Sequence, residues 1–207
     1  MATRIAGLTG ATLPTAPSVC HECIWWQTRG GRSLDKRKWI AKTEEEWGAW
    51  GSVYYDEDER LLGSMQYGPA PLFPRAYELP AGPPSNEAVL VTCAYLVDPG
   101  SPWVMQSLFL SAIGDARDKG GAAVEAFAYR YPEGESNYER FHVHKTIFPR
   151  DFLADFGFVT VRAAGRVELV RLELGGLQPV MEGKRLAVLE ALKEAFAPAP
   201  APVPPRP

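Results

Sequence analysis

Acid–base chemistry in this sequence would fall to a few carboxylates and imidazoles in its second half. Glu125 lies within the apolar run Ala123–Tyr129, where a charge must be paired or face water. His142 and His144 alternate along the chain, so both point to one side of an extended segment. A carboxylate or an imidazole can accept the proton of an amine near neutral pH. These three residues are candidate bases; the alternatives are a paired structural carboxylate and two exposed polar residues.

Cys20 and Cys23 have the Cys-x-x-Cys spacing of metal ligands and redox dithiols. A structural zinc site needs four ligands, and the second Cys-x-x-Cys that would complete one is missing. His142 and His144 could complete the set, but His-x-His is not the usual spacing. A redox dithiol would need a thioredoxin-like setting. We therefore expect no zinc and interpret both thiols as partly buried beside the two tryptophans that follow them.

Composition indicates an ordinary globular protein. The chain has 207 residues, of which 46% are hydrophobic and 23% charged, enough for one substantial core. Lysine and arginine total 22 against 25 for aspartate and glutamate, so the formal net charge is −3. Nucleic acids and anionic membranes need a basic face, so we expect neither as a partner. The basic segment 29–38 is interpreted as a solvated face.

The sequence also bears on the compartment. Its first ten residues hold no long apolar run, so no secretory signal is expected. No stretch approaches the roughly 20 apolar residues that span a bilayer. Three cysteines, an odd number, do not make a disulfide framework. These features favour a cytoplasmic protein.

The elements that must position the candidate residues can be predicted from hydrophobic periodicity and from the residues that cap helices and form turns. Residues 1–18 are small, polar and proline-dotted, which predicts a flexible arm. The remaining expectations for the first half are, in order, a short buried strand at Cys23–Trp26, a helix at Ser33–Trp47 with Ser33 as its N-cap, strands at Gly51–Tyr55 and Leu61–Tyr67 joined by an acidic hairpin turn, and a loop from Pro69 to Pro84.

The central elements carry the strongest signals. Ala88–Val97 is an almost continuous apolar run, typical of a central strand covered on both faces. A helix follows, with Ser101 as N-cap and Pro102 at its first position, and Gly120-Gly121 ends it. Ala123–Tyr129 is the next strand.

The last part of the chain should close the sheet. We expect a short helix at 149–155, paired strands at Phe158–Arg162 and Val167–Leu174, and an extra helix at about 182–196 with one apolar stripe. That helix would pack on the sheet edge or form a homodimer. The Ala/Pro tail 197–207 should be disordered, which leaves one domain over residues 19–196.

Two segments in this order resemble the GNAT (N-acetyltransferase) superfamily. AIGDARDKGGAAVEAF at 112–127 resembles the long helix and following strand of those enzymes. DFLADFGF at 151–158 is similar to their short helix ending in Gly-Phe. The opening Cys-x-x-Cys-x-x-Trp, with Glu46-Trp47-Gly48 and Tyr67-x-Pro69-Ala70, resembles an actinobacterial-type subgroup. The resemblance covers about residues 20–176 and implies an α/β (α+β) fold, a mixed, mostly antiparallel sheet flanked by helices.

The resemblance implies transfer of an acetyl group from acetyl-CoA to an amine, on a small molecule or a protein. It places the thioester carbonyl and the pantetheine along Cys93, Ala94, Tyr95, Leu96 and Val97. The acceptor would arrive from the side of the loops 69–84 and 131–146. Holding the carbonyl against a strand and aiming the amine at it are the main tasks of such a site.

The chain departs from the family pattern at the pyrophosphate loop. The family uses glycines there so that backbone N–H groups approach the phosphates at a helix N-terminus. The loop positions fall on Trp103, Val104, Met105 and Gln106, which puts an indole and a thioether where the glycines would be, and Pro102 removes one donor. The loop therefore predicts weak or absent acetyl-CoA binding.

A second departure concerns the acid that protonates the departing thiolate. The family tyrosine falls on Leu153, which cannot donate a proton, and Tyr129, Tyr131 or Tyr138 could replace it. The alternative to an acetyltransferase is a GNAT-fold protein without that activity, serving as a ligand-binding or protein-interaction module. A third hypothesis is a metal-stabilised regulatory protein using Cys20 and Cys23.

Overall fold

The computed structural model describes residues 3–30, 32–132 and 144–175, all within one compact unit, Met1–Gly175. Its strands are β1 (Arg4–Gly7), β2 (Gly51–Tyr55), β3 (Leu61–Pro69), β4 (Ala88–Leu96), β5 (Ala123–Tyr129), β6 (His144–Lys145), β7 (Phe148–Pro149), β8 (Val159–Ala164) and β9 (Val167–Glu173). Its helices are α1 (Ser18–His21), α2 (Lys36–Glu46), α3 (Pro102–Asp118) and α4 (Arg150–Ala154), with short 3-10 helices at Leu13–Thr15, Ala70–Leu72 and Pro74–Glu78.

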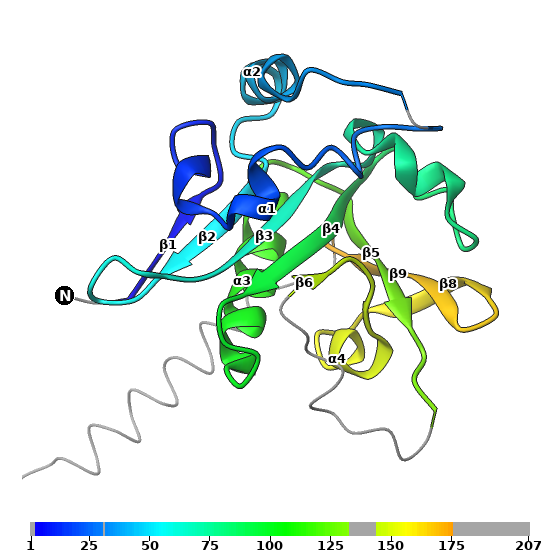
Figure 1. Cartoon of the computed structure of the whole chain (residues 1–207). Coiled ribbons are helices and arrows are strands. Elements are labelled where there is room, and N and C mark those ends of the chain that lie inside the picture. Colours follow the sequence, from blue (N-terminus) through cyan, green and yellow to red (C-terminus); the bar gives the residue numbers. More distant parts are fainter. Residues whose placement is uncertain (1–2, 31, 133–143, 176–207) are drawn as a thin grey trace, which may run out of the picture. The chain divides into compact units, whose positions relative to one another are not determined.

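Within the described residues the strands form one sheet in the order β1-β2-β3-β4-β5-β9-β8, with β6 beside β4 and β7 beside β5 (Figure 1). The β4–β5 and β5–β7 pairs are parallel and the others are antiparallel. This confirms the expected mixed, mostly antiparallel sheet flanked by helices. The predicted helix at 182–196 and the tail 197–207 lie outside the described residues.

The long helix α3 covers one face of the sheet because its apolar residues recur at helical spacing. Leu108, Phe109 and Ala112 are fully buried and pack with the apolar side chains of β4 and β5. Gly120 ends the helix with a φ of 75°, in the left-handed region that glycine tolerates best. The predicted helix is confirmed, with Ser101 at its N-cap position and Pro102 as its first residue.

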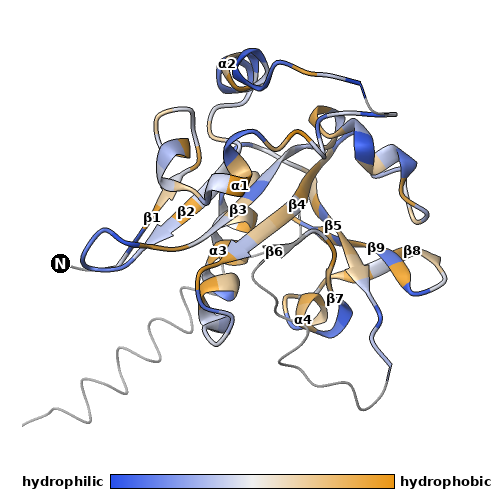
Figure 2. Cartoon of the chain, in the orientation of Figure 1, coloured by the Kyte–Doolittle hydropathy of each residue, from blue (hydrophilic) through white to orange (hydrophobic). Residues whose placement is uncertain are grey.

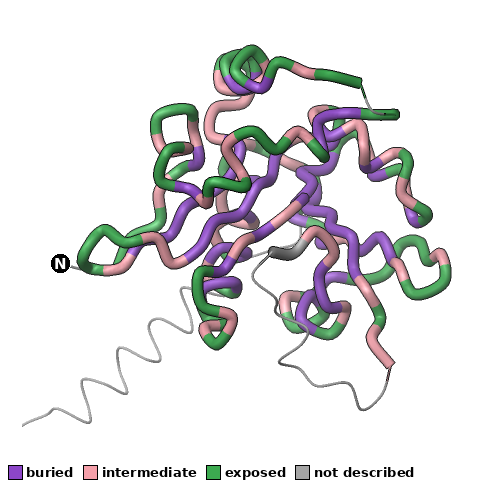
Figure 3. Tube along the Cα trace, viewed as in Figure 1, coloured by how far each residue is buried: buried purple, intermediate pink, exposed green. Residues whose placement is uncertain are grey.

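Two smaller clusters cover the opposite face. One gathers Trp26, Phe73, Phe127 and Leu169 around Leu90 of β4. The other packs Ile40 of α2 and Trp50 against β2. The central strand β4 is therefore buried on both sides, as its apolar run predicted. The strand is largely apolar in Figure 2, and Figure 3 shows buried residues along the central strands.

Three predictions for the N-terminal part are wrong in detail. Arg4–Gly7 is not a flexible arm but pairs as β1 with β2, Arg4 lying opposite Tyr55. Cys23–Trp26 is irregular and leads into a turn at Trp25 rather than forming a strand, with Trp26 buried and Trp25 exposed. The Cys23 carbonyl accepts from Lys36 and not from a neighbouring strand. Helix α2 begins at Lys36, because Asp35 rather than Ser33 accepts the first free N–H groups.

The predicted loop 69–84 is also more ordered than expected. It contains two 3-10 helices, and Ala70, Phe73, Ala76 and Ala81 are fully buried in the core beside β4. Its apolar side chains thus cover the sheet, and they do not form an open wall for a substrate.

Among the described residues no helix is long and apolar enough to span a membrane.

Candidate functional site

A β-bulge interrupts β4 at Thr92. Cys93 lies opposite Gln66 of β3, but the next pair joins Val91 to Tyr67, so Thr92 has no partner of its own. The Thr92 hydroxyl lies 3.1 Å from the carbonyl oxygen of Gln66 and 3.0 Å from its side-chain oxygen, and donates to this residue. Bulges recur next to active sites because they re-aim the side chains that follow.

The bulge reverses which face of the sheet each side chain of β4 meets. Before it, Val89 and Val91 join the core beneath α3. After it, Ala94 and Leu96 do so, although strict alternation would have placed Cys93 there. Cys93 instead packs against the cluster on the opposite face. One extra residue therefore turns a thiol away from the helix and towards the N-terminal segment.

Strands β4 and β5 separate just beyond this bulge. They pair in parallel from Ala88 with Ala123 to Val91 with Ala126, and the pairing stops there. Past that point β4 pairs with β6 and β5 pairs with β7. The sheet thus opens between its two central strands, and a short piece of the chain, 144–149, lies in the opening (Figure 1).

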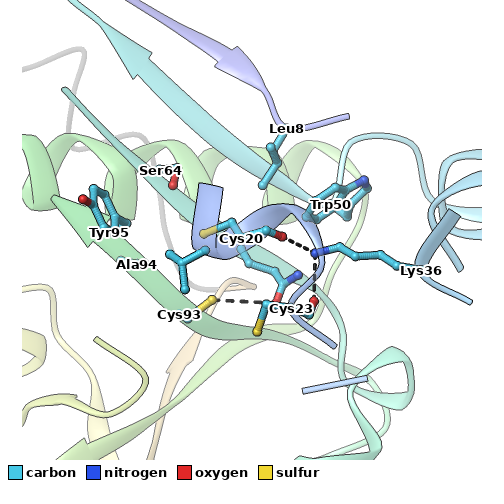
Figure 4. A pocket seen from close by; sticks show the side chains of 11 residues that line it. Leu8, Cys20, Cys23, Lys36, Trp50, Ser64, Cys93, Ala94 and Tyr95 are labelled. Atoms are coloured by element: carbon cyan, nitrogen blue, oxygen red, sulfur yellow. Dashed lines mark hydrogen bonds between the residues drawn. The ribbon is translucent and has the colours of Figure 1, made fainter. Parts of the chain in front are cut away.

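A small cavity, partly open to solvent, lies against β3 and β4 on the side where Cys93 points. Its volume is ≈ 30 Å³, room for one or two water molecules. It is lined by apolar and thiol groups together with a few polar ones: Leu8, Val19, Cys20, Cys23, Lys36, Trp50, Ser64, Gln66, Cys93, Ala94 and Tyr95. The three cysteines of the chain gather here beside Lys36, although Cys93 lies far in sequence from Cys20 and Cys23 (Figure 4).

Burial sets the charge of this cluster. It raises the pKa of Cys93 to about 12 and raises the pKa of Cys20, so both are neutral thiols near pH 7. Burial also lowers the pKa of Lys36. The Lys36 ammonium donates to the carbonyl oxygens of Cys20 and Cys23, the latter at 2.8 Å. Within the described ranges no three His, Cys, Asp or Glu side chains are placed to hold a metal ion.

In the turn before α3, the carboxylate of Asp98 already accepts the nearby hydrogen-bond donors. Asp98 accepts the backbone N–H of Gly100 at 2.9 Å and the hydroxyl of Ser101 at 2.9 Å. Pro102 has no N–H to offer. The negative charge and the lost donors both work against an incoming phosphate at this helix N-terminus.

The residues predicted for the pyrophosphate loop divide between surface and core. Trp103 is 45% exposed and packs edge-on against Tyr54, with ring centroids 5.6 Å apart, and Gln106 is exposed. Val104 and Met105 lie on the buried face of α3. The Met105 thioether therefore points into the core and not into solvent.

Glu125 is a paired, buried carboxylate. One oxygen accepts from Arg171 at 2.9 Å and the other from the backbone N–H of Ser85 at 2.8 Å. It lies opposite Leu90, on the paired half of β4 and β5 and before the opening. The structure thus places Glu125 apart from the Cys93–Val97 segment and in the structural role that was its alternative.

The other candidates lie nearer the opening. The backbone of His144 is in β6 opposite Tyr95, and Tyr131 follows β5 with its ring 4.9 Å from that of Tyr129. His142 and Tyr138 lie outside the described residues. Leu153 is fully buried, so this position supplies no acid.

Three functional features were missed from the sequence: the bulge at Thr92, the Asp98 turn and the Lys36 contacts. Asp98-Pro99-Gly100-Ser101 does carry a turn signal, because aspartate side chains accept N–H groups two residues on. Nothing local in the sequence marks the other two.

No protein-family model and no curated protein sequence match the chain. Solved structures do. A GNAT-family acetyltransferase from Listeria monocytogenes matches with a TM-score of 0.48 and 12% identity, over 83% of this chain and 95% of that one. The structure of yncA from Salmonella typhimurium with its cofactor acetyl-CoA matches at 0.45 and 15%, over 84% and 95%. The ribosomal-protein-S18-alanine N-acetyltransferase from Escherichia coli matches at 0.46 and 10%, over 86% and 97%. The chain is similar to these acetyltransferases along most of its length.

Proposed function

We propose that this chain is an acyl-CoA-dependent N-acyltransferase of the GNAT type, which transfers an acetyl group to an amine. The observation that carries the proposal is the opening between β4 and β5 directly after the bulge at Thr92. Beyond Val91 the backbone of β4 loses β5 as a partner and must find another. A thioester with its pantetheine amides along Cys93–Val97 would be such a partner, as the family resemblance implies.

The reaction at this edge would be a direct acyl transfer. The amine nitrogen attacks the thioester carbonyl carbon, a C–N bond forms as the C–S bond breaks, and the electron pair leaves with sulfur. The amine proton passes to a base. Because Glu125 is held by Arg171 and Ser85, we favour His144 or His142 for that proton, with Tyr131 as donor to the thiolate.

The acceptor would not enter through the thiol-lined cavity, which holds little more than water. The 3-10 helices of segment 69–84 pack against the core, which leaves the side of β4 and β5 near Tyr95 and Tyr131 for its approach. We propose a primary amine on a small molecule or a protein as the acceptor.

The test is turnover with a panel of amines. The purified chain is incubated with acetyl-CoA and, in turn, a polyamine, an amino acid, a lysine peptide and a peptide with a free N-terminus, and the products are read by mass spectrometry. Acetylation of one class, with matching release of CoA, is the expected result. Absence of product in every class would overturn the proposal.

A second candidate function, a GNAT-like fold without acyltransferase activity, is favoured by Asp98. Its carboxylate already takes the N–H of Gly100, where a pyrophosphate would need donors. Asp98→Asn keeps an acceptor oxygen for this turn but removes the charge. An acyltransferase should then bind acetyl-CoA several-fold more tightly, with acetyl-pantetheine, which lacks the pyrophosphate, unchanged as the matched control. Failure of both ligands to bind either form supports the second candidate.

A further inference from the structure

We infer that strand β6 is an internal strap that occupies the cofactor edge of β4, so that acetyl-CoA binds only after β6 leaves. This inference rests on the proposed function, since it concerns regulation of that same edge. The inference goes beyond the proposed function because it names the segment that competes with the cofactor.

The pairing of β6 places it on the residues assigned to the thioester. Ala94 lies opposite Lys145 and Tyr95 opposite His144, in antiparallel register. Directly opposed residues in such a ladder alternate between a pair that exchanges two N–H···O bonds and a pair that exchanges none. One of these two pairs is therefore bonded, and it satisfies backbone groups that pantetheine would need.

The other edge of β4 offers no substitute. There Ala94 pairs with Met65 and Tyr95 with Ser64 of β3. Each edge of a strand holds one ladder at a time, so β6 and a bound pantetheine exclude each other on Ala94 and Tyr95. In Figure 1, β6 lies alongside β4 within the sheet.

The segment that contains β6 is held strongly at β7 and weakly at β6 itself. Next to β6, β7 pairs with β5, Phe148 lying opposite Ala128. Phe148 is fully buried, and its ring lies 4.9 Å from that of Phe109 of α3. β6 itself spans only two residues. Local opening takes the least stable contacts first, so β6 should detach while β7 stays in the core.

The size of the effect follows from the ladder. The apparent dissociation constant equals the intrinsic one divided by the fraction of molecules with β6 detached. Two backbone hydrogen bonds correspond to a change of about 5- to 150-fold in affinity. Releasing the strap should therefore tighten acetyl-CoA binding by that factor, without altering any residue of β4.

The experiment is calorimetric titration of acetyl-CoA into three full-length proteins: the unmodified chain, the double variant His144→Pro/Lys145→Pro and the matched control His144→Ala/Lys145→Ala. Proline has no N–H, and its ring occupies the place of that hydrogen. Whichever residue faces β4, the first variant therefore removes the donated bond and blocks the approach that the reciprocal bond needs, while alanine keeps both bonds. The readout is binding, so a role of His144 in proton transfer does not enter.

We expect the double proline variant to bind about 5- to 150-fold more tightly than the alanine control. Equal binding by the two variants would overturn the strap and leave the proposed function standing. Failure of all three proteins to bind would overturn the proposed function and the strap with it.

If the double proline variant does not fold, hydrogen exchange on the unmodified chain decides. Saturating acetyl-CoA should speed exchange in the peptide that carries His144 and Lys145 while slowing it at Ala94 and Tyr95. Bound acetyl-CoA with unchanged exchange in β6 would overturn the inference.

Discussion

Replacing Glu125 tests whether this residue is a structural carboxylate or a catalytic base. Its side chain is 3% exposed and that of its partner Arg171 20% exposed, with 2.9 Å between the charged atoms. Removing one partner of a buried ion pair costs about 3–5 kcal/mol. Arg171 keeps a second partner, Glu173, and some access to water, so we expect the lower end, about 3 kcal/mol, for Glu125→Ala.

Two further variants calibrate that figure. Glu125→Gln retains an acceptor oxygen and the side-chain shape, and should cost about 1–2 kcal/mol. Glu173→Gln removes the other carboxylate on the same arginine; because Glu173 is 66% exposed, its loss should cost less than about 1 kcal/mol. Urea denaturation measures all three as a shift of the midpoint with an unchanged slope.

The reasoning would be refuted if Glu125→Ala stayed within about 0.5 kcal/mol of the unmodified chain. It would also be refuted if Glu125→Gln kept full stability but lost acyl transfer by about 100-fold or more, the signature of a base.

Two other predictions concern titration and thiol reactivity. Burial alone would raise the pKa of Glu168, but hydrogen bonds from Thr160 and Arg130 and the charge of Arg150 outweigh it and lower the net value. The ionised Glu168 carboxylate should therefore stabilise the fold fully above its unfolded pKa of about 4.3, and this stabilisation should be lost as the pH falls through the lower pKa of the folded state. In Glu168→Gln, the midpoint of urea denaturation should depend less on pH in that acidic range. Iodoacetamide at about pH 8 should label exposed Cys23 faster than half-buried Cys20 and Cys93, because burial raises the pKa of the latter two thiols, as peptide mass mapping would show; equal labelling of the three in native protein would contradict it.

The central elements were predictable because their signals are local. The apolar run at Ala88–Val97, the Ser101-Pro102 start and the Gly120-Gly121 stop each act within a few residues. β4, α3 and β5 follow them closely. The short helix α4 and the strand pair β8–β9 were found for the same reason.

The candidate site depends on long-range contacts that no local pattern records. The opening of the sheet begins next to one unpaired residue, Thr92, in a run that is otherwise almost continuously apolar. The carbonyl groups of Cys20 and Cys23, at the end of α1 and just after it, are held by Lys36, thirteen or more residues away. β1 exists only because β2 offers an edge, and two-residue β6 only because β4 does. These elements are too short for periodicity to reveal them.

The most direct test of the account is to map acetyl-CoA onto the backbone by NMR. The account predicts shift changes at Cys93–Val97, in the last part of β4 and just after it, at β6 and around Ser101 at the start of α3, with β8 and β9 unaffected. Changes confined to the surface between α1 and α2, or none at saturating acetyl-CoA, would contradict it.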